Sequence, residues 1–358
     1  ASRAIPDARR GGSKMSRKAA VAENAVSSAQ PAPYNRLSSD LHEYEAAMEF
    51  VRGLHNLRAW HRGCVLTIGA FDGVHRGHQE MIRVLREQAA RHGLPAVVLS
   101  FEPTPREFFA RGAPPARLTR FRERFMAFER YGVGRFVCLR FNERMRSTPQ
   151  DRFVEDILVR GLGARHIVVG HDFRFARDLA GSVATLREYG PRCGFEVTEV
   201  APFEIDGQRV SSSLIRETLD AGDMVRAAKL LGRPYGITGK VIHGAKLGRK
   251  LGFPTANLRL HRRATPLAGI FAVKVSGGGL SNAPGVASLG TRPVVNGKEL
   301  LLEAHVFDFD GDLYRQYVTV DFIARLRDEL WFPSVDDLVV QMHKDAAQAR
   351  EILAANPS

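Results

Sequence analysis

The segment TIGAFDGVHRGH at residues 67–78 constrains the fold more than any other part of this chain. It joins an apolar stretch at 65–68, which we expect to form a strand, to an amphipathic helix through a glycine-rich turn. The unpaired N–H groups and positive dipole end of a helix attract phosphate, and glycine lets phosphate oxygens approach the backbone. His75 and His78 stand where that helix begins and offer further donors. The segment therefore predicts a site that binds a nucleoside triphosphate and stabilises charge at its α-phosphate.

A short histidine–glycine pattern also arises by chance, so its context decides. Here it follows a strand and opens a helix whose apolar residues Ile82, Leu85 and Ala89 share one face. In that context the segment resembles the nucleotidylyltransferase superfamily, whose members transfer a nucleotidyl group and release pyrophosphate. We expect the catalytic pair to be His75 and His78, and the ATP contacts to include Gly69, Phe71, Asp72 and Gly77.

Strands and helices alternate from residue 65 to about 231, which predicts a parallel sheet covered by helices on both faces. Such sheets bind ligands at the carboxyl ends of their strands, near a topological switch point. The expected strands cover 65–68, 96–101, 136–141, 166–170 and 196–200, and the expected helices include 120–130 and 150–160.

After Leu231 the pattern changes to short alternating segments separated by glycine and proline, which predicts an antiparallel barrel. The expected strands cover 239–243, 270–275, 301–309 and 317–322, with one closing helix at about 335–353. We therefore predict two domains, at 49–231 and 232–358. Residues 1–48 are rich in Ala, Ser, Arg and Pro and are expected to be disordered, with a transit peptide as the less favoured reading.

A second group in the first domain is the segment VSSSLIR at 210–216, which precedes a helix. Its serines can simply cap that helix. Ser212 and Arg216 also form a phosphate clamp of hydroxyl and guanidinium donors. The superfamily carries a similar Ser-Ser-Thr-x-x-Arg segment at this place, and Ser213 keeps the hydroxyl where the threonine stands.

Two further segments close strands of the first domain and are the expected flavin contacts. The segment FEPTPREF at 101–108 is stiffened by two prolines, and its two terminal rings can flank a flat ligand; a stiff strand-to-helix connection is the alternative. The segment GHDFRF at 170–175 offers a carboxylate and aromatic faces. The expected contacts are Phe101, Pro103, Pro105, Phe108 and Asp172.

The second domain has its own glycine-rich cationic loop at 241–257, without the spacing of an ordinary phosphate-binding loop. Gly244 and Gly248 allow close backbone approach, and Lys246 supplies charge. Thr255 and Asn257 offer the hard oxygen ligands that Mg²⁺ prefers on ATP phosphates. A plain surface turn is the alternative for this loop.

Glu303 lies in an alternating strand, on the same face as His305 and Phe307. A carboxylate on a barrel wall beside an ATP site can accept a proton from an attacking hydroxyl. Residue patterning alone also fits a solvated strand face.

Together these segments resemble the bacterial bifunctional riboflavin kinase/FAD synthetase family, over about four-fifths of the chain. The motifs GFPTAN at 252–257, GVASLGTRP at 285–293 and LRDELWF at 326–332 carry the resemblance, with the first segment. It implies that the barrel phosphorylates riboflavin to FMN with Glu303 as base, and that Arg327 lies on the flavin side. It also implies that the first domain transfers AMP from ATP to FMN, giving FAD and pyrophosphate, with Ser212 and Arg216 on the departing phosphates. The implied cofactor is Mg²⁺, with ATP as co-substrate.

One departure from the family pattern keeps an alternative open. The loop at 175–181 reads FARDLAG, with fewer glycines than the family usually has. A kinase-only enzyme with an impaired adenylyltransferase domain is therefore the first alternative. The departures Val294, Arg315 and Trp331 concern the flavin side of the barrel.

The formal charge of +13 raises a second alternative, a nucleic-acid-binding protein. The chain has no basic stripe interleaved with aromatics and no zinc finger, so we expect small-molecule substrates and no nucleic acid. Three widely spaced cysteines and the lack of a long apolar run predict a cytoplasmic protein without a membrane segment. Whether the chain forms a homo-oligomer stays open.

Overall fold

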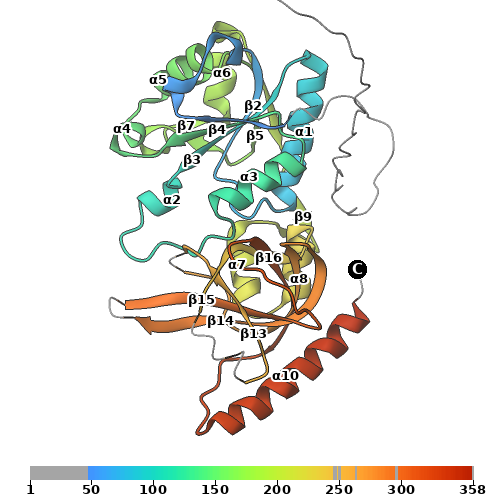
Figure 1. Cartoon of the computed structure of the whole chain (residues 1–358). Coiled ribbons are helices and arrows are strands. Elements are labelled where there is room, and N and C mark those ends of the chain that lie inside the picture. The colour runs from blue at the N-terminus through green and yellow to red at the C-terminus, as the bar shows by residue number, and fades with distance from the viewer. Residues whose placement is uncertain (1–46, 245–247, 249–250, 263, 295–296, 357–358) are drawn as a thin grey trace, which may run out of the picture. The chain divides into compact units, whose positions relative to one another are not determined.

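The computed structural model describes residues 47–244, 248, 251–262, 264–294 and 297–356, so the predicted disorder of the N-terminal extension concerns residues almost wholly outside it. Six strands form one parallel sheet in the order β1-β4-β3-β2-β5-β8, as the alternating pattern predicted (Figure 1). Along the described ranges, no helix combines the length and hydropathy that a bilayer crossing requires. The strands are β1 Glu49–Arg52, β2 Cys64–Ile68, β3 Ala96–Glu102, β4 Arg135–Arg140, β5 Ala164–Gly170 and β8 Glu196–Val200.

Apolar side chains on both faces of this sheet explain why helices cover both. On one face Val65, Val98 and Phe136 pack against Ile82 of α1 and Phe128 of α3. The next residues along the same strands point the other way and pack against the segment 153–161 and α6. The covering helices are α1 Arg76–His92, α3 Phe121–Arg130, η3 Phe153–Gly161 and α6 Val183–Cys193.

Shorter elements connect this framework. They are η1 Leu54–Asn56, η2 Ala59–His61, α2 Pro105–Phe108, α4 Glu143–Arg146, α5 Gln150–Arg152, β6 Arg174–Phe175, η4 Arg177–Leu179, β7 Gly181–Ser182, β9 Glu204–Ile205, β10 Gln208–Arg209, α7 Ser212–Asp220 and α8 Met224–Leu231. The five predicted strands all exist, within two residues at each end. Strand β1 was missed, because an edge strand of four residues gives little periodicity. The helix predicted at 150–160 is a short α-helix that continues as π-helix to Gly161.

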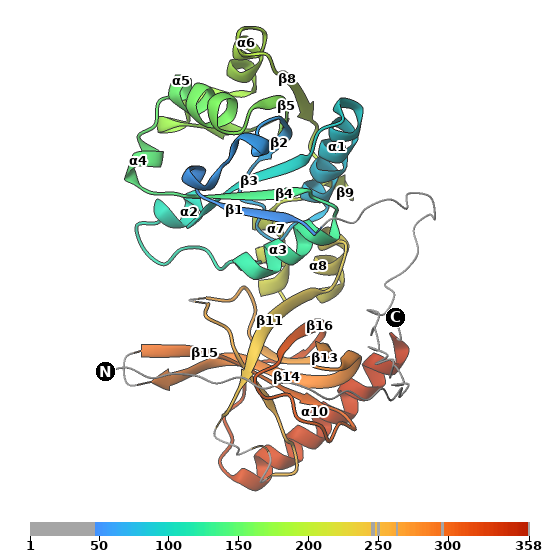
Figure 2. The same cartoon turned by 45° about the horizontal axis from the view of Figure 1, so that its top comes forward.

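The second part of the chain forms the predicted closed antiparallel barrel, in the order β11-β12-β15-β14-β13-β16, followed by α10 (Figure 2). The bounds are β11 Tyr235–Ile242, β12 Ala256–Arg259, β13 Gly269–Gly277, β14 Leu280–Val294, β15 Gly297–Val306, β16 Tyr317–Arg327 and α10 Val335–Ala355. Strands β12 and β14 were absent from the predicted set. Strand β14 contains Pro284 and Pro293, which argue against a strand in sequence, yet it pairs with β13 and β15 along its length.

Alternation along β15 separates the barrel interior from its outer wall. Leu302, Ala304 and Val306 are buried in the interior cluster. Phe307, beyond the end of β15, packs with Ala349 and Leu353 of α10. The helix α10 thus covers part of the wall formed by β13, β14 and β16.

Helices α7 and α8 contribute Ile215, Leu219 and Leu230 to the same apolar cluster as the barrel residues Tyr235 and Phe322. At the predicted boundary near Leu231 the secondary structure changes from alternating strands and helices to barrel strands. The apolar core nevertheless continues across this boundary. As a functional boundary it stays a prediction.

Candidate functional sites

The two histidines meet at the start of α1. His75 is the N-cap residue, and the backbone N–H of His78 donates to its Nδ1 at 3.4 Å. The two rings stack with centroids 3.6 Å apart and an interplanar angle of 17°. The N-cap explains the geometry, because capping turns the His75 side chain back over the first helical turn. His75 and His78 lie three positions apart, with Gly77 between them, and the cap brings their two imidazole rings face to face.

Burial lowers the pKa of both rings and so favours their neutral forms. Burial lowers the pKa of His75 to about 3, and the charges of Arg209, Arg233 and Arg216 add to that shift. Burial also lowers the pKa of His78 far below its usual value, with a smaller contribution from His75. The Nδ1 atom of His78 is buried and, among the described residues, has no hydrogen-bond partner. A buried polar atom without a partner is costly, so it is a group for which a ligand would supply the missing contact.

A hollow of about 260 Å³ opens beside this pair. Its walls include Ile68, Gly170 and Val200, which are the last residues of β2, β5 and β8. The hollow thus lies at the carboxyl ends of the strands, where the chain order turns back across the sheet. Of the predicted contacts, the hollow is lined by Gly77, His75, His78, Asp172 and Ser212.

Asp72 holds the segments around the hollow together. Its carboxylate accepts from the backbone N–H groups of Thr119 at 2.9 Å and Leu118 at 3.2 Å, and it forms an ion pair with Arg216. The Ser212 hydroxyl donates to the Asp72 carbonyl at 2.9 Å. In this structure Asp72 and Arg216 therefore neutralise each other, and with the Ser212 bond they fix α7 beside the first glycine-rich turn.

Phe71 and Gly69 sit behind the hollow. The Phe71 side chain is 1% exposed and packs edge-on against Phe128, so its ring belongs to the core. A Cβ atom on Gly69 would lie 3.1 Å from the Phe71 ring, which explains the glycine by packing. Any contact of these two residues with ATP would have to come from their backbone.

The predicted flavin segment brings aromatic rings together. Phe101 and Phe108 both pack edge-on against Phe141, with centroids 5.7 and 5.2 Å away. Pro103 follows a cis peptide bond, and Pro105 begins α2, which Thr104 caps. Both rings thus pack against Phe141, a third ring that was not among the predicted contacts.

Two arginines on the hollow were missed in the sequence. Arg209 donates to the Asp172 carboxylate at 2.6 Å, and Arg106 lies 3.4 Å from the Ser213 hydroxyl. Both line the same hollow. Arg106 lies inside the predicted flavin segment, so its position there was a usable signal; Arg209 lies on the two-residue strand β10, which carries no recognisable pattern.

In the barrel, the predicted glycines lie against the predicted magnesium ligands. A Cβ on Gly244 would lie 2.4 Å from Asn257 Oδ1, and one on Gly248 would lie 2.3 Å from the Phe253 carbonyl and 3.3 Å from Thr255 Oγ1. At Gly248, where the obstacle is a backbone carbonyl, only glycine allows this approach. The Asn257 amide donates to the Thr255 hydroxyl at 3.4 Å, so the two oxygen-bearing side chains are neighbours. Lys246 lies outside the described residues.

Glu303 faces these residues across the sheet. It is directly opposite Asn257 in the pairing of β12 with β15. Directly paired residues hold their Cβ atoms about 5 Å apart on the same side of a sheet. His305, two residues along on that side, contacts the Pro254 carbonyl at 2.8 Å through Nδ1. The half-buried Glu303 carboxylate is thus brought next to the Thr255–Asn257 pair by strand register.

A second hollow of about 390 Å³ adjoins this group, on the side of the barrel interior. Thr255 lines it, together with Ala304, Val306 and the turn at 309–314. That turn, with Asp310, Asp312 and Tyr314, was not among the predicted contacts. Glu303 and Asn257 do not line this hollow.

Arg327 has a visible structural partner. Its guanidinium donates to Asp345 of α10 through Nε at 2.9 Å and Nη2 at 2.7 Å. Asp345 is 4% exposed. The side chain of Arg327 therefore ties α10 to β16, and its predicted flavin contact has no counterpart among these bonds.

The loop at 175–181, whose sequence departs from the family pattern, has left-handed backbone at residues other than glycine. Ala176 has φ 63° and ψ −172°, and Asp178 and Leu179 also have positive φ. The first of these regions is nearly exclusive to glycine. Along the described part of the chain, however, this loop contributes no wall to the histidine hollow.

The fold and the two hollows define the class: a two-part protein in which an α/β domain, whose helix α1 begins at a glycine-rich turn, is joined to an antiparallel barrel. Residues 57–214 match the model of the FAD synthetase family, and residues 231–353 match that of riboflavin kinase. The chain belongs to the bifunctional riboflavin kinase/FMN adenylyltransferase family, which confirms the resemblance.

Curated relatives with that name match along nearly their whole length. The protein of Pseudomonas fluorescens is 49% identical over 86% of this chain and 98% of its own. Those of Haemophilus influenzae and Escherichia coli K12 are 45% and 42% identical over 85% of this chain, and 98% and 97% of their own.

A solved structure from Streptococcus pneumoniae, titled as a macrolide-efflux protein, has a TM-score of 0.73 and 31% identity. It covers 84% of this chain and 97% of its own. The similarity extends over both parts of the chain, so that structure has the same two-part architecture.

Proposed function

We propose that this chain phosphorylates riboflavin to FMN in its barrel and then transfers AMP from ATP to FMN in its α/β domain, releasing pyrophosphate. One observation carries the proposal: two families of flavin-nucleotide enzyme match consecutive parts of the chain, and each part has its own glycine-lined polar site. We place the functional boundary near Leu231, with the adenylyltransferase at 49–231 and the kinase at 232–358.

Adenylyl transfer asks for positioning and charge stabilisation. The phosphate of FMN has a second pKa of about 6 and is already a competent nucleophile at neutral pH. The neutral imidazoles of His75 and His78 would donate hydrogen bonds to the α-phosphate as negative charge develops there. Ser212 and the start of α7 would hold the departing pyrophosphate, and Arg106 and Arg209 supply positive charge on the same hollow.

Phosphorylation of riboflavin asks for a base, because a ribityl hydroxyl is only weakly acidic. Glu303 would accept that proton, in line with its position opposite Asn257. The Thr255 hydroxyl and the Asn257 amide oxygen are hard ligands of the kind that Mg²⁺ takes, and they would hold it. Bound there, the ion would neutralise phosphate charge on ATP.

Incubation with FMN and MgATP, with separation of products by chromatography, tests the adenylyltransferase half. Equal amounts of FAD and pyrophosphate are expected. Riboflavin with MgATP tests the kinase half, where FMN should appear before FAD. Failure to form either flavin nucleotide while ATP is consumed would refute the proposal.

The kinase-only alternative has one observation in its favour, the strained loop at Ala176–Leu179. Its signature is FMN accumulation from riboflavin with no FAD formed from added FMN. The loop's separation from the walls of the histidine hollow favours the bifunctional assignment.

A further inference from the structure

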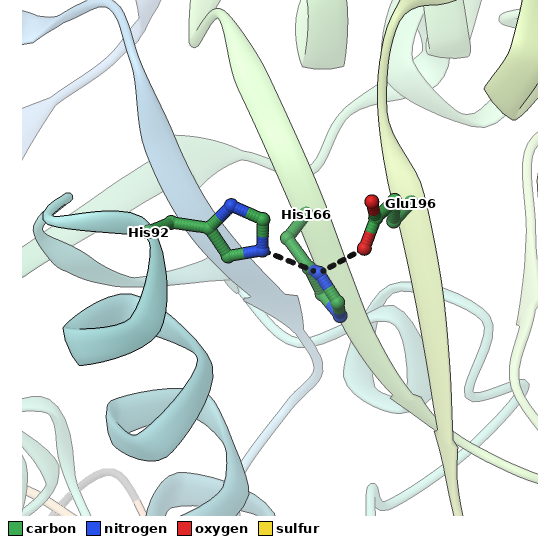
Figure 3. Close-up of side chains that lie close together, drawn as sticks. All are labelled: His92, His166 and Glu196. Carbon is green, nitrogen blue, oxygen red and sulfur yellow. Dashed lines mark hydrogen bonds and ion pairs between the residues drawn. The ribbon is translucent and has the colours of Figure 1, made fainter.

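Three metal-binding side chains meet at the end of α1 that is opposite to the catalytic pair. His92 is the last residue of α1, and His166 and Glu196 lie near the starts of the neighbouring strands β5 and β8. Figure 3 shows the two imidazole rings and the carboxylate converging from these three elements. His166 and Glu196 are paired directly across the sheet, so strand register holds them together.

The distances match the edges of a small coordination polyhedron. His92 Nε2 lies 3.1 Å from His166 Nδ1, and His166 Nδ1 lies 3.4 Å from the Glu196 carboxylate. All three ligand atoms lie within 4.8 Å of one another. Tetrahedral Zn²⁺ with bonds of about 2.0–2.2 Å would separate its ligand atoms by about 3.4 Å. Two of the three separations therefore need little change, and the exposed side chains of His92 and Glu196 are free to adjust the third.

A hydrogen bond on the far side of the ring prepares His166 for this role. Its Nε2 lies 2.7 Å from the Thr198 hydroxyl. A proton on Nε2 that is donated to Thr198 leaves the lone pair on Nδ1, which is the atom that faces His92 and Glu196. Metal-binding histidines in proteins characteristically have such a partner on the other ring nitrogen. The buried His166 is thus oriented, while the two exposed residues complete the set.

A surface hollow beside two of the three side chains leaves room for a fourth ligand. A surface hollow of about 420 Å³ includes His92 and Glu196 in its walls, with Pro191 and Phe195. Arg165 lines the same hollow, and the negative charge of Glu196 offsets its repulsion of a cation. Two imidazoles and one carboxylate suit Zn²⁺ and similar transition metals better than Mg²⁺, which prefers oxygen ligands and retains its waters.

We propose that His92, His166 and Glu196 form a binding site for Zn²⁺ or a similar divalent transition metal, with water as the fourth ligand. The site is separate from both phosphate sites. It would join the last turn of α1 to β5 and β8, and so brace the helix whose other end carries His75 and His78. An ion that binds the folded chain and not the unfolded one stabilises the fold.

The test is metal binding by the full chain after dialysis against a chelator. Zn²⁺ is titrated against a chromophoric competitor, and Co²⁺ replaces it to give the visible absorption of a tetrahedral nitrogen–oxygen site. One ion per chain and a rise in melting temperature with Zn²⁺ are expected. His92→Gln and Glu196→Gln should each weaken binding at least about tenfold, since even outer partners of metal ligands are worth that much.

Two exposed residues outside the cluster provide matched controls, His55→Gln and Glu188→Gln, and both should bind Zn²⁺ like the unmodified chain. His92→Gln and Glu196→Gln change surface side chains, so loss of folding is not the expected result, and circular dichroism checks it. Equal Zn²⁺ affinity in the unmodified chain and these two variants would overturn the proposal, as would a Co²⁺ spectrum without tetrahedral bands. Hydrogen bonding alone would then account for the cluster.

Discussion

The neutral state of the buried histidine pair predicts a specific dependence of stability on pH. Burial holds the pKa of His75 at about 3, whereas the unfolded chain has an imidazole of ordinary pKa near 6.5. Between these values the unfolded chain binds the extra proton, so the free energy of unfolding falls as the pH falls. The contribution is fully present above pH 6.5, and the loss ends near pH 3. His75→Asn removes this titration while an amide oxygen still caps α1.

The size of the effect follows from the two pKa values. Each pH unit below 6.5 costs about 1.4 kcal/mol for one such group, so pH 5 costs about 2 kcal/mol relative to pH 7.5. The side chain of His75 is only 6% exposed, so solvent screens little of this. Loss of its ring also removes one cause of the lowered pKa of His78, which adds in the same direction.

Urea unfolding at pH 7.5 and pH 5, followed by circular dichroism, measures the effect. The decrease in the free energy of unfolding between the two pH values should be about 2 kcal/mol smaller in His75→Asn than in the unmodified chain. His55→Asn is the matched control, because this histidine is exposed, and it should leave the decrease unchanged. An equal decrease in His75→Asn and the unmodified chain would show that His75 is not held neutral by burial.

Four further predictions concern single residues. Thr255→Val should slow riboflavin phosphorylation about 10–100-fold, the range for lost metal-supporting contacts, and leave FAD formation from FMN intact; steady-state rates of both reactions decide, and equal losses would contradict separate sites. Arg209→Gln should lower kcat/KM for FMN adenylylation about tenfold, since it removes one charge-assisted contact beside Asp172; unchanged kinetics would remove Arg209 from the site. Arg327→Met should lower the free energy of unfolding by about 3 kcal/mol, because the buried Asp345 carboxylate loses its counter-charge and keeps only the uncharged Gln341 amide among the bonds described here, and urea unfolding without such a loss would refute the anchoring role. Ala176→Gly should raise the free energy of unfolding by about 1 kcal/mol through relief of backbone strain, and a lower melting temperature would contradict this.

Hydrophobic periodicity and the positions of glycine and proline predicted the architecture, because the buried strands of the sheet repeat one pattern: an apolar stretch bounded by turn residues. Strands β2, β3, β4 and β5 contain apolar runs bounded by turns, and they were predicted together with the more polar edge strand β8. The elements that escaped prediction have stability that comes from partners elsewhere in the chain. Strand β14 includes two prolines and two glycines, and only its neighbours in the barrel show it to be a strand.

The same distinction holds within the sites. Spacing along the chain predicted that His75 lies near His78 and Thr255 near Asn257, because the members of each pair are only three or two positions apart. The spacing did not predict side-chain orientation. Phe71 turns into the core, and the Asp72 carboxylate accepts a hydrogen bond from a segment more than forty residues away. The cluster of His92, His166 and Glu196 could not be predicted either, because strand register brings His166 next to Glu196 and the end of α1 adds His92.

The most direct test of the central claim uses two variants and two reactions. Glu303→Gln should abolish FMN formation from riboflavin and leave the conversion of FMN to FAD largely intact. His78→Ala should show the opposite pattern, with adenylylation slowed about 100–1,000-fold, the usual cost of one lost charge-stabilising donor. Product chromatography with each substrate gives all four rates. If either variant loses both activities in parallel while remaining folded, the account of two independent sites acting in sequence is wrong.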